Sequence, residues 1–181
     1  MIEIRLHGRG GQGGVTSAEL LARAAIGQGR FAQAFPSFGP ERRGAPVVAF
    51  VRVSDEQIRL REKIYEPNIV LVLDPTLLDI VNVAEGLKEG GMVVVNSSHT
   101  ASELKKKYKW PKAAGVDADS IALQELGVPI TNTTMLGALL KATGIVPVET
   151  LEPVIMDRFG GKLGPKNFKA LKRAFDETAL A

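Results

Sequence analysis

The hydrophobic positions near the start of the chain change from the period of a strand to the period of a helix. Apolar and charged residues alternate over residues 2–6 and lead into a glycine cluster, a pattern typical of a strand that ends in a tight turn. From Val15 to Ala25, apolar residues recur every three or four positions, which predicts a helix ending near residues 27–29. The chain therefore begins with a strand, a glycine turn and a helix.

The middle of the chain carries the patterns of further strands. Residues 31–35 and 47–53 are each predicted to form a strand, and alternation over residues 57–60 predicts a short antiparallel partner in a hairpin. The runs at residues 69–73 and 92–95 are continuously apolar. Such runs are expected of strands that helices cover on both faces.

Helical periodicity dominates most of the remaining segments. The predicted helices cover residues 76–87, 102–108, 120–126, 134–143, 148–159 and 165–178. One more short strand is predicted at residues 113–116. Together these elements predict a single α/β domain over residues 1–181, in which helices flank a Rossmann-like, mixed and mostly parallel sheet and the C-terminal part is helical.

The composition excludes several kinds of chemistry. The chain has no cysteine, so disulfides, thiolate-bound zinc and cysteine-bound iron–sulfur clusters are excluded within it. The two histidines, His7 and His99, show no ligand spacing, and we expect no metal site. A net charge of +3 is mild, and basic and acidic residues are interspersed, so nucleic acid is not an expected partner.

Neither a membrane-spanning run nor a signal-peptide pattern is visible in the sequence. No apolar stretch approaches the roughly 18–20 residues that a membrane helix needs. The first residues lack a basic segment followed by an apolar one. We therefore expect a cytoplasmic protein that does not bind membranes.

The glycine cluster fits a phosphate-binding template. Residues 8–13 read Gly-Arg-Gly-Gly-Gln-Gly, which matches G-x-G-x-x-G directly after a predicted strand and before a predicted helix. Glycines allow a sharp turn and close approach of a ligand, and free amides at a helix start attract phosphate. A tight turn that binds nothing has the same spacing, so the motif alone leaves both interpretations open.

The residues after the second predicted strand argue against a nicotinamide site. Such a site needs an acidic residue about 20 positions after the glycine turn to hold the ribose hydroxyls, but residues 28–40 contain no Asp or Glu. Instead Arg42 and Arg43 follow in a loop rich in proline and glycine. Guanidinium groups bind phosphate in bidentate geometry, although a solvated loop or an acidic protein partner would also explain them.

At this point the sequence resembles a known family. Residues 5–13 (RLHGRGGQG), residues 31–46 (FAQAFPSFGPERRGAP) and the Val-Ala-Phe-Val-Arg strand that follows resemble the gamma subunits of pyruvate:ferredoxin oxidoreductases, also called pyruvate synthases. Residues 74–78 and 132–138 are similar to the same family, so the resemblance covers essentially the whole chain. Gly14 stands where an aliphatic residue is expected, and Thr134 where proline is usual.

The resemblance implies a multisubunit enzyme of anaerobic metabolism. Such enzymes decarboxylate a 2-oxoacid oxidatively to an acyl-CoA and pass the electrons to ferredoxin. Thiamine diphosphate, magnesium and iron–sulfur clusters would lie in alpha-, beta- and delta-type partner subunits, so this chain would contact ferredoxin only indirectly. Its own expected role is to help bind coenzyme A and to assemble the complex, with no catalytic residue and no bound cofactor.

Carrying this role onto matching positions gives a set of candidate coenzyme A contacts. The glycine turn would approach the phosphates, a hydroxyl at the helix start would donate a hydrogen bond, and the paired arginines would supply charge. The candidates are Gly8, Arg9, Gly10, Gly11, Gln12, Gly13, Thr16, Ser17, Arg42 and Arg43.

Other functions and contacts remain open from the sequence. A branched-chain 2-oxoacid oxidoreductase has a similar gamma subunit, and a non-catalytic nucleotide-binding subunit is a second alternative. A stand-alone NAD-dependent enzyme is disfavoured by the missing acid. Phe35, Phe38 and Met135 are candidates for subunit contacts, although core packing explains each of them as well.

Overall fold

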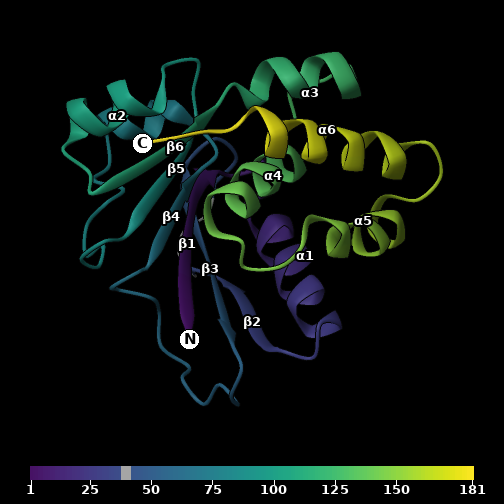
Figure 1. Ribbon diagram of the computed structural model, residues 1–181, viewed down its shortest axis with the longest axis horizontal. Helices are drawn as coiled ribbons and strands as arrows, with labels where there is room; N and C mark the ends of the chain where they lie inside the picture. The colour runs from purple at the N-terminus through teal and green to yellow at the C-terminus, as the bar shows by residue number, and fades with distance from the viewer. Residues whose placement is uncertain (38–41) are drawn as a thin grey trace.

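The computed structural model describes residues 1–37 and 42–181, which fold around one mixed sheet (Figure 1). The strand order is β2-β3-β1-β4-β5-β6-β7. The strands are β1 (Ile2–Arg9), β2 (Phe31–Pro36), β3 (Pro46–Ser54), β4 (Ile69–Val72), β5 (Met92–Asn96), β6 (Lys112–Val116) and β7 (Ala179–Leu180). Neighbouring strands β1, β4, β5 and β6 run parallel, whereas β2, β3 and β7 join through antiparallel pairings.

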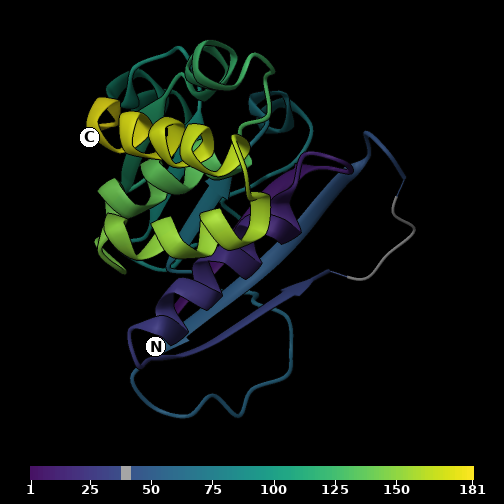
Figure 2. The ribbon, with the colours of Figure 1, turned by 90° about the vertical axis from the view of Figure 1, so that its right-hand side faces the viewer.

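Helices cover the two faces of the sheet unequally. The α-helices are α1 (Gly14–Gly27), α2 (Ala101–Tyr108), α3 (Ala118–Leu126), α4 (Asn132–Thr143), α5 (Leu151–Phe159) and α6 (Leu163–Glu177), and the short 3-10 helices are η1 (Pro75–Asp79) and η2 (Val148–Thr150). Helices α1, α3, α4, α5 and α6 pack on one face, and α2 with the segment around η1 packs on the other (Figures 1 and 2). This arrangement confirms the predicted α/β class and the helical C-terminal part.

Strand alternation explains how one sheet serves two cores. Ile4 and Leu6 of β1 face the layer of α1 and α4, whereas Val70 and Val72 of β4 face α2.

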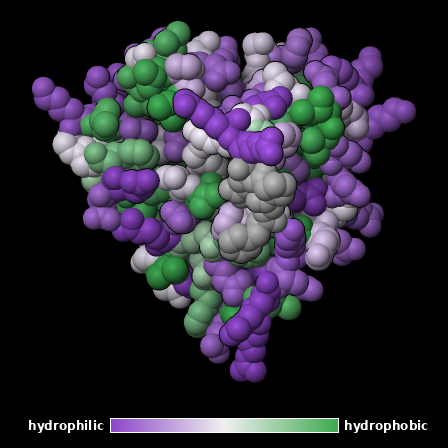
Figure 3. Space-filling view, turned by 180° about the vertical axis from the view of Figure 1, so that it is seen from behind, coloured by the Kyte–Doolittle hydropathy of each residue, from purple (hydrophilic) through white to green (hydrophobic). Residues whose placement is uncertain are grey.

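Met135 is fully buried in the first core, so core packing accounts for it without a subunit contact. Phe35 packs against Phe50 with ring centroids 5.2 Å apart, and Phe38 lies outside the described residues. On the face seen from behind, hydrophobic side chains form small separate patches among hydrophilic ones (Figure 3).

The helix predicted at residues 76–87 is wrong. Only η1 forms there, followed by turns up to β5. The buried Arg5 guanidinium takes the carbonyls of Val83 and Glu85 as acceptors, and Gly86 has a φ of 72°. These carbonyls bond a side chain from β1, and the left-handed glycine is incompatible with a continuing helix.

Three further elements differ from the sequence prediction. Residues 57–60 form no strand, because this segment is irregular and offers its Leu60 carbonyl to the Gln33 side chain. The helix predicted at residues 148–159 is divided into η2 and α5. The short edge strand β7 was not predicted, since two residues carry no readable periodicity.

Helices α4 and α6 approach so closely that Gly137 has no room for a side chain. A β-carbon at this position would meet the Leu171 carbonyl and the Phe175 amide nitrogen of α6. Backbone atoms cannot move aside without shifting the helix, so the α4–α6 contact requires glycine here.

Gly137→Ala is therefore expected to destabilise the chain by about 2–3 kcal/mol or more, through overpacking between helices. Urea unfolding followed by circular dichroism measures the free energy of unfolding. Gly27→Ala is the matched control, because a β-carbon there meets nothing within 4 Å and alanine is the better helix former. Equal stability of the two variants would contradict this account.

Candidate functional site

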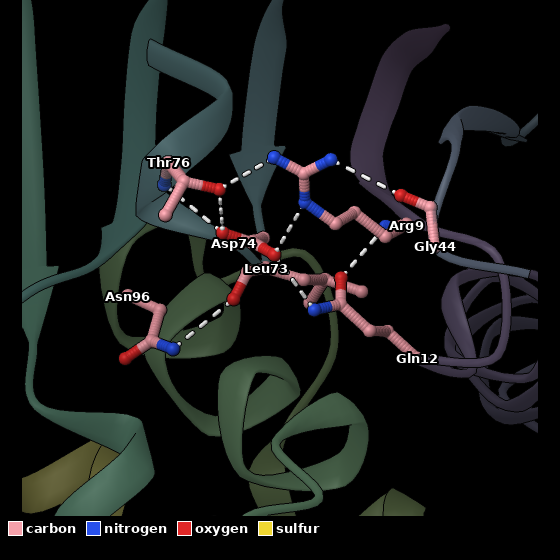
Figure 4. Close-up of polar contacts among 7 residues, drawn as sticks. All are labelled: Arg9, Gln12, Gly44, Leu73, Asp74, Thr76 and Asn96. Atoms are coloured by element: carbon pink, nitrogen blue, oxygen red, sulfur yellow. Dashed lines mark hydrogen bonds and ion pairs between the residues drawn. The ribbon is translucent and has the colours of Figure 1, made fainter. Parts of the chain in front are cut away.

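The candidate site lies at the topological switch point of the sheet, at the carboxyl ends of β1 and β4. After β1 the chain runs through α1 to the β2–β3 side of the sheet, and after β4 it continues to β5 on the other side. Ligands of open α/β sheets bind in the crevice at such a switch point. The residues gathered here come from the glycine turn, from residues 42–45 and from the ends of β4 and β5 (Figure 4).

The glycine turn adopts a backbone that only glycine accommodates easily. Gly11 and Gly13 have φ values of 93° and 77°, and a β-carbon on Gly13 would lie 2.5 Å from the Asn132 side-chain nitrogen. Gly13 is the N-cap of α1, and within the described residues no side chain caps this helix and no acidic residue lies in its first turn. The first amides of α1 are thus the unpaired donors expected of an anion-binding helix start.

Arg9 holds the site together rather than facing an open ligand position. Its Nε donates to Asp74 Oδ2 at 3.0 Å, one Nη donates to Thr76 Oγ1 at 2.7 Å, and the other to the Gly44 carbonyl at 3.1 Å (Figure 4). The guanidinium therefore links the end of β1 to the start of η1 and to residues 42–45, which include Arg42 and Arg43.

Gln12 completes the same network from within the turn. Its side-chain oxygen accepts the Arg9 amide at 2.7 Å, and its side-chain nitrogen donates to Asp74 Oδ2 at 2.9 Å. Asp74 also accepts the Thr76 amide and hydroxyl at 2.9 and 2.6 Å. We call Arg9, Gln12, Asp74 and Thr76 the Asp74 clamp.

The charge of Asp74 is favoured by its neighbours. Burial acts to raise the pKa of Asp74, but hydrogen bonds from Thr76 and Gln12 and the charge of Arg9 lower that pKa below its usual value. The carboxylate stays ionised near neutral pH, so the clamp keeps its charge-assisted bonds there.

Residues 42–45 lie directly against the glycine turn. The Gly10 amide donates to the Ala45 carbonyl at 2.9 Å, and the Gly44 amide donates to the Gly10 carbonyl at 3.1 Å. A β-carbon on Gly10 would lie 2.5 Å from the Arg42 carbonyl oxygen, so this close approach requires glycine. The contact brings the exposed Arg42 and Arg43 beside the turn, as the predicted phosphate site requires.

The two candidate hydroxyls have different surroundings. Ser17 is fully buried, and its hydroxyl is engaged with the carbonyls of Asn132 at 3.1 Å and Gly13 at 3.2 Å. Thr16 is partly exposed and lines a hollow beside the turn. Of the pair, Thr16 is the one that a ligand can reach.

Two hollows flank the turn and differ in charge. The first, of about 290 Å³, is lined by the turn glycines and Thr16 over an apolar floor that includes Val15 and Val47. The second, of about 180 Å³, is bordered by Asp74 and Asp119. A phosphate is attracted to the amides and Thr16 of the first hollow and repelled by the carboxylates of the second.

Sequence reasoning missed Asp74 and Asn96 as parts of the site. Asn96 donates to the Leu73 carbonyl at 3.0 Å and accepts the Ala118 amide at 3.0 Å. It therefore ties the end of β4 to the start of α3. Their position was a readable signal, because each polar residue stands at or just after the carboxyl end of an apolar run.

His7 is buried near the site but has no sign of a metal-binding role. Its Nε2 accepts a hydrogen bond from Arg5 Nε at 3.1 Å. Burial and the charge of Arg5 lower the pKa of His7 to about 4, so the ring is neutral at physiological pH. In the described part of the chain, no three His, Asp or Glu side chains gather as metal ligands would.

Among the described helices, none has the length and apolar character that crossing a membrane requires.

The comparisons with known proteins agree over the whole chain. A family model described as pyruvate ferredoxin/flavodoxin oxidoreductase matches residues 3–177. The chain belongs to this family. It is 59% identical over 182 residues to the pyruvate/ketoisovalerate oxidoreductases common subunit gamma of Thermococcus litoralis, covering 99% of this chain and 98% of that protein.

Further relatives support the same membership. The pyruvate synthase subunit PorC of Methanocaldococcus jannaschii is 55% identical over 177 residues, which are 98% of this chain and 97% of that protein. The crystal structure of pyruvate oxidoreductase subunit PORC from Thermotoga maritima has a TM-score of 0.88 and 41% identity, covering 99% of this chain and 98% of that one. The predicted gamma-type family and α/β fold are confirmed.

Asp74→Asn is expected to destabilise the chain by about 1–3 kcal/mol at neutral pH, because Arg9 and Gln12 lose their charged acceptor. A carboxylate with a lowered pKa contributes stability that is complete above its ordinary pKa near 3.8 and is lost as the pH falls through the lowered value. The difference between the two proteins should therefore shrink in acid. Urea unfolding at pH 7 and at pH 3 measures this, with the exposed Asp79→Asn as control.

Proposed function

We propose that this chain is the gamma subunit of a pyruvate, or related 2-oxoacid, ferredoxin oxidoreductase and that it helps to bind coenzyme A. The family membership and the gamma-subunit relatives support the first part. One contact carries the second, namely the backbone bonds that bring the Arg42–Arg43 loop against Gly10 beside the open start of α1.

The chemistry of coenzyme A matches this arrangement. The ligand carries a pyrophosphate and a ribose 3′-phosphate, which are separate anionic groups. The amides of the turn and Thr16 bind the pyrophosphate, and Arg42 and Arg43 bind phosphate oxygens at the rim. In this proposal the side chains of Arg9, Gln12 and Ser17 do not contact the ligand. They hold the turn in place through their hydrogen bonds within the protein.

The same proposal places the redox chemistry in other subunits. A chain without cysteine binds no iron–sulfur cluster through thiolates. We assign thiamine diphosphate, magnesium and the clusters to alpha-, beta- and delta-type partners in a cytoplasmic complex, with ferredoxin reached through them. Catalysis of CoA-dependent oxidative decarboxylation then takes place outside this chain.

The choice of 2-oxoacid is proposed to lie outside this chain as well. The Thermococcus relative is named as a subunit common to pyruvate and ketoisovalerate oxidoreductases. A subunit shared in this way does not select between the two acids, so a branched-chain enzyme is the second candidate for the assembly that contains this chain.

Replacing both Arg42 and Arg43 with alanine tests the coenzyme A site. In the assembled enzyme, the double variant is expected to raise the KM for coenzyme A about tenfold or more, because charge-assisted bonds to phosphate are lost. The KM for the 2-oxoacid should stay unchanged. Steady-state ferredoxin reduction with varied coenzyme A measures both constants.

The matched control is the double variant Arg59→Ala with Arg61→Ala, which removes two exposed arginines elsewhere. It should leave both constants unchanged. If the Arg42 and Arg43 variant forms the complex and keeps the native KM for coenzyme A, the loop is not a phosphate site and serves assembly or structure instead.

A further inference from the structure

Helix α2 and the turn after it present an uncompensated group of lysines. Residues 101–112 contain five lysines and a single acid, Glu103, which gives a local charge of +4 against +3 for the whole chain. None of these lysines lies within 4.0 Å of a carboxylate oxygen belonging to the described residues. We call Lys105, Lys106, Lys107, Lys109 and Lys112 the lysine surface.

Helix α6 carries both paired and unpaired cations, because Lys166 and Lys172 have no carboxylate oxygen within 4.0 Å among the described residues. There Lys169 pairs with Glu125 at 2.8 Å, and Arg173 pairs with Glu125 and Glu177 at 3.2 and 2.6 Å. On α2 the only acid is occupied differently, because Glu103 accepts the Thr100 amide at 2.8 Å in a capping box. The charge of the lysine surface is therefore not neutralised by carboxylates of the described residues.

Stabilisation of α2 explains only part of this surface. Lysines in the last turn of a helix interact favourably with its C-terminus, and this applies to Lys105, Lys106 and Lys107. Lys109 is the C-cap residue of α2, where a cation is also favourable, and Lys112 lies beyond the helix at the start of β6. The charge of Lys112 adds repulsion without helping the helix, so the surface extends further than helix stability requires.

The aromatic residues of the segment argue for a protein partner over nucleic acid. Tyr108 stacks on Trp110 with ring centroids 4.7 Å apart, and the Lys107 ammonium lies 4.9 Å from the Tyr108 ring centroid. Trp110 is only 7% exposed. These rings are occupied, so they offer no platform for stacking bases, and the segment has no arginine for bidentate phosphate contacts.

We propose that the lysine surface docks against a carboxylate-rich surface of another subunit of the oxidoreductase. Complementary charge supplies the recognition, as expected for an interface of exposed lysines. Helix α2 lies on the face of the sheet opposite α1 (Figure 1), so this contact is separate from the glycine turn. The inference rests on the proposed assembly role and is independent of the coenzyme A site.

Carbodiimide cross-linking of the purified complex tests this contact, because the reagent joins lysine amines to carboxylates that are in ion-pair contact. Peptide mass spectrometry should find links from the lysine surface to Asp or Glu residues of another subunit, and high salt during the reaction should suppress them. If links form elsewhere in the complex but none joins these lysines to another subunit, the proposal is wrong.

The triple variant Lys106→Gln, Lys107→Gln and Lys112→Gln provides the second measurement. Association with the partner subunits at low salt should weaken about tenfold, the sum for three surface ion pairs, and the difference should vanish at high salt. The control Lys162→Gln, Lys166→Gln and Lys172→Gln changes the net charge equally on the exposed side of α6.

Two results would overturn the proposal in this second measurement. One is an equal weakening by the control, which would make net charge the cause. The other is native association of the α2 variant at low salt, and a loss of binding to a fluorescent oligonucleotide by the same variant would then identify a nucleic-acid surface. The assembled α2 variant should keep the native KM for coenzyme A, which separates failure of this contact from failure of the coenzyme A site.

Discussion

The carboxylate of Asp74 is the constraint on which the candidate site depends. It stands at the carboxyl end of β4 and accepts hydrogen bonds from Arg9, Gln12 and Thr76. Through Arg9 the same network reaches the Gly44 carbonyl, so one partly buried charge positions the glycine turn and residues 42–45 together. A ligand that meets both segments finds them already in place, and less ordering entropy opposes its binding.

The surroundings of each arginine decide what it does. Arg52 is 1% exposed and pairs with Glu3 at 3.0 Å. Arg5 donates to the main-chain carbonyls of Val83 and Glu85. Their hydrogen-bond partners lie inside the protein, although Nη1 of Arg52 has none among the described residues, so these side chains serve the fold. Arg42 and Arg43 are exposed beside an open helix start, which is the placement that suits an incoming phosphate.

The sequence allowed the elements with a clear period to be predicted, together with the glycine turn that joins the first two. It did not allow the function of Arg9 to be recognised, because its partner Asp74 lies 65 positions away in the sequence. The false helix at residues 76–87 has the same origin. Local periodicity favoured a helix, whereas the Val83 carbonyl bonds Arg5, which is 78 positions distant.

Two glycines allow segments that are far apart in the sequence to pack closely against each other. Gly10 allows the 42–45 backbone to lie against the turn, and Gly137 allows α6 to lie against α4, which in turn places Asn132 beside Gly13. In both cases a backbone approaches where any side chain would collide. The C-terminal helices therefore contribute to the site indirectly. Their close packing fixes Asn132, which borders the start of α1. The residues that border the glycine turn therefore come from segments that lie far apart in the sequence.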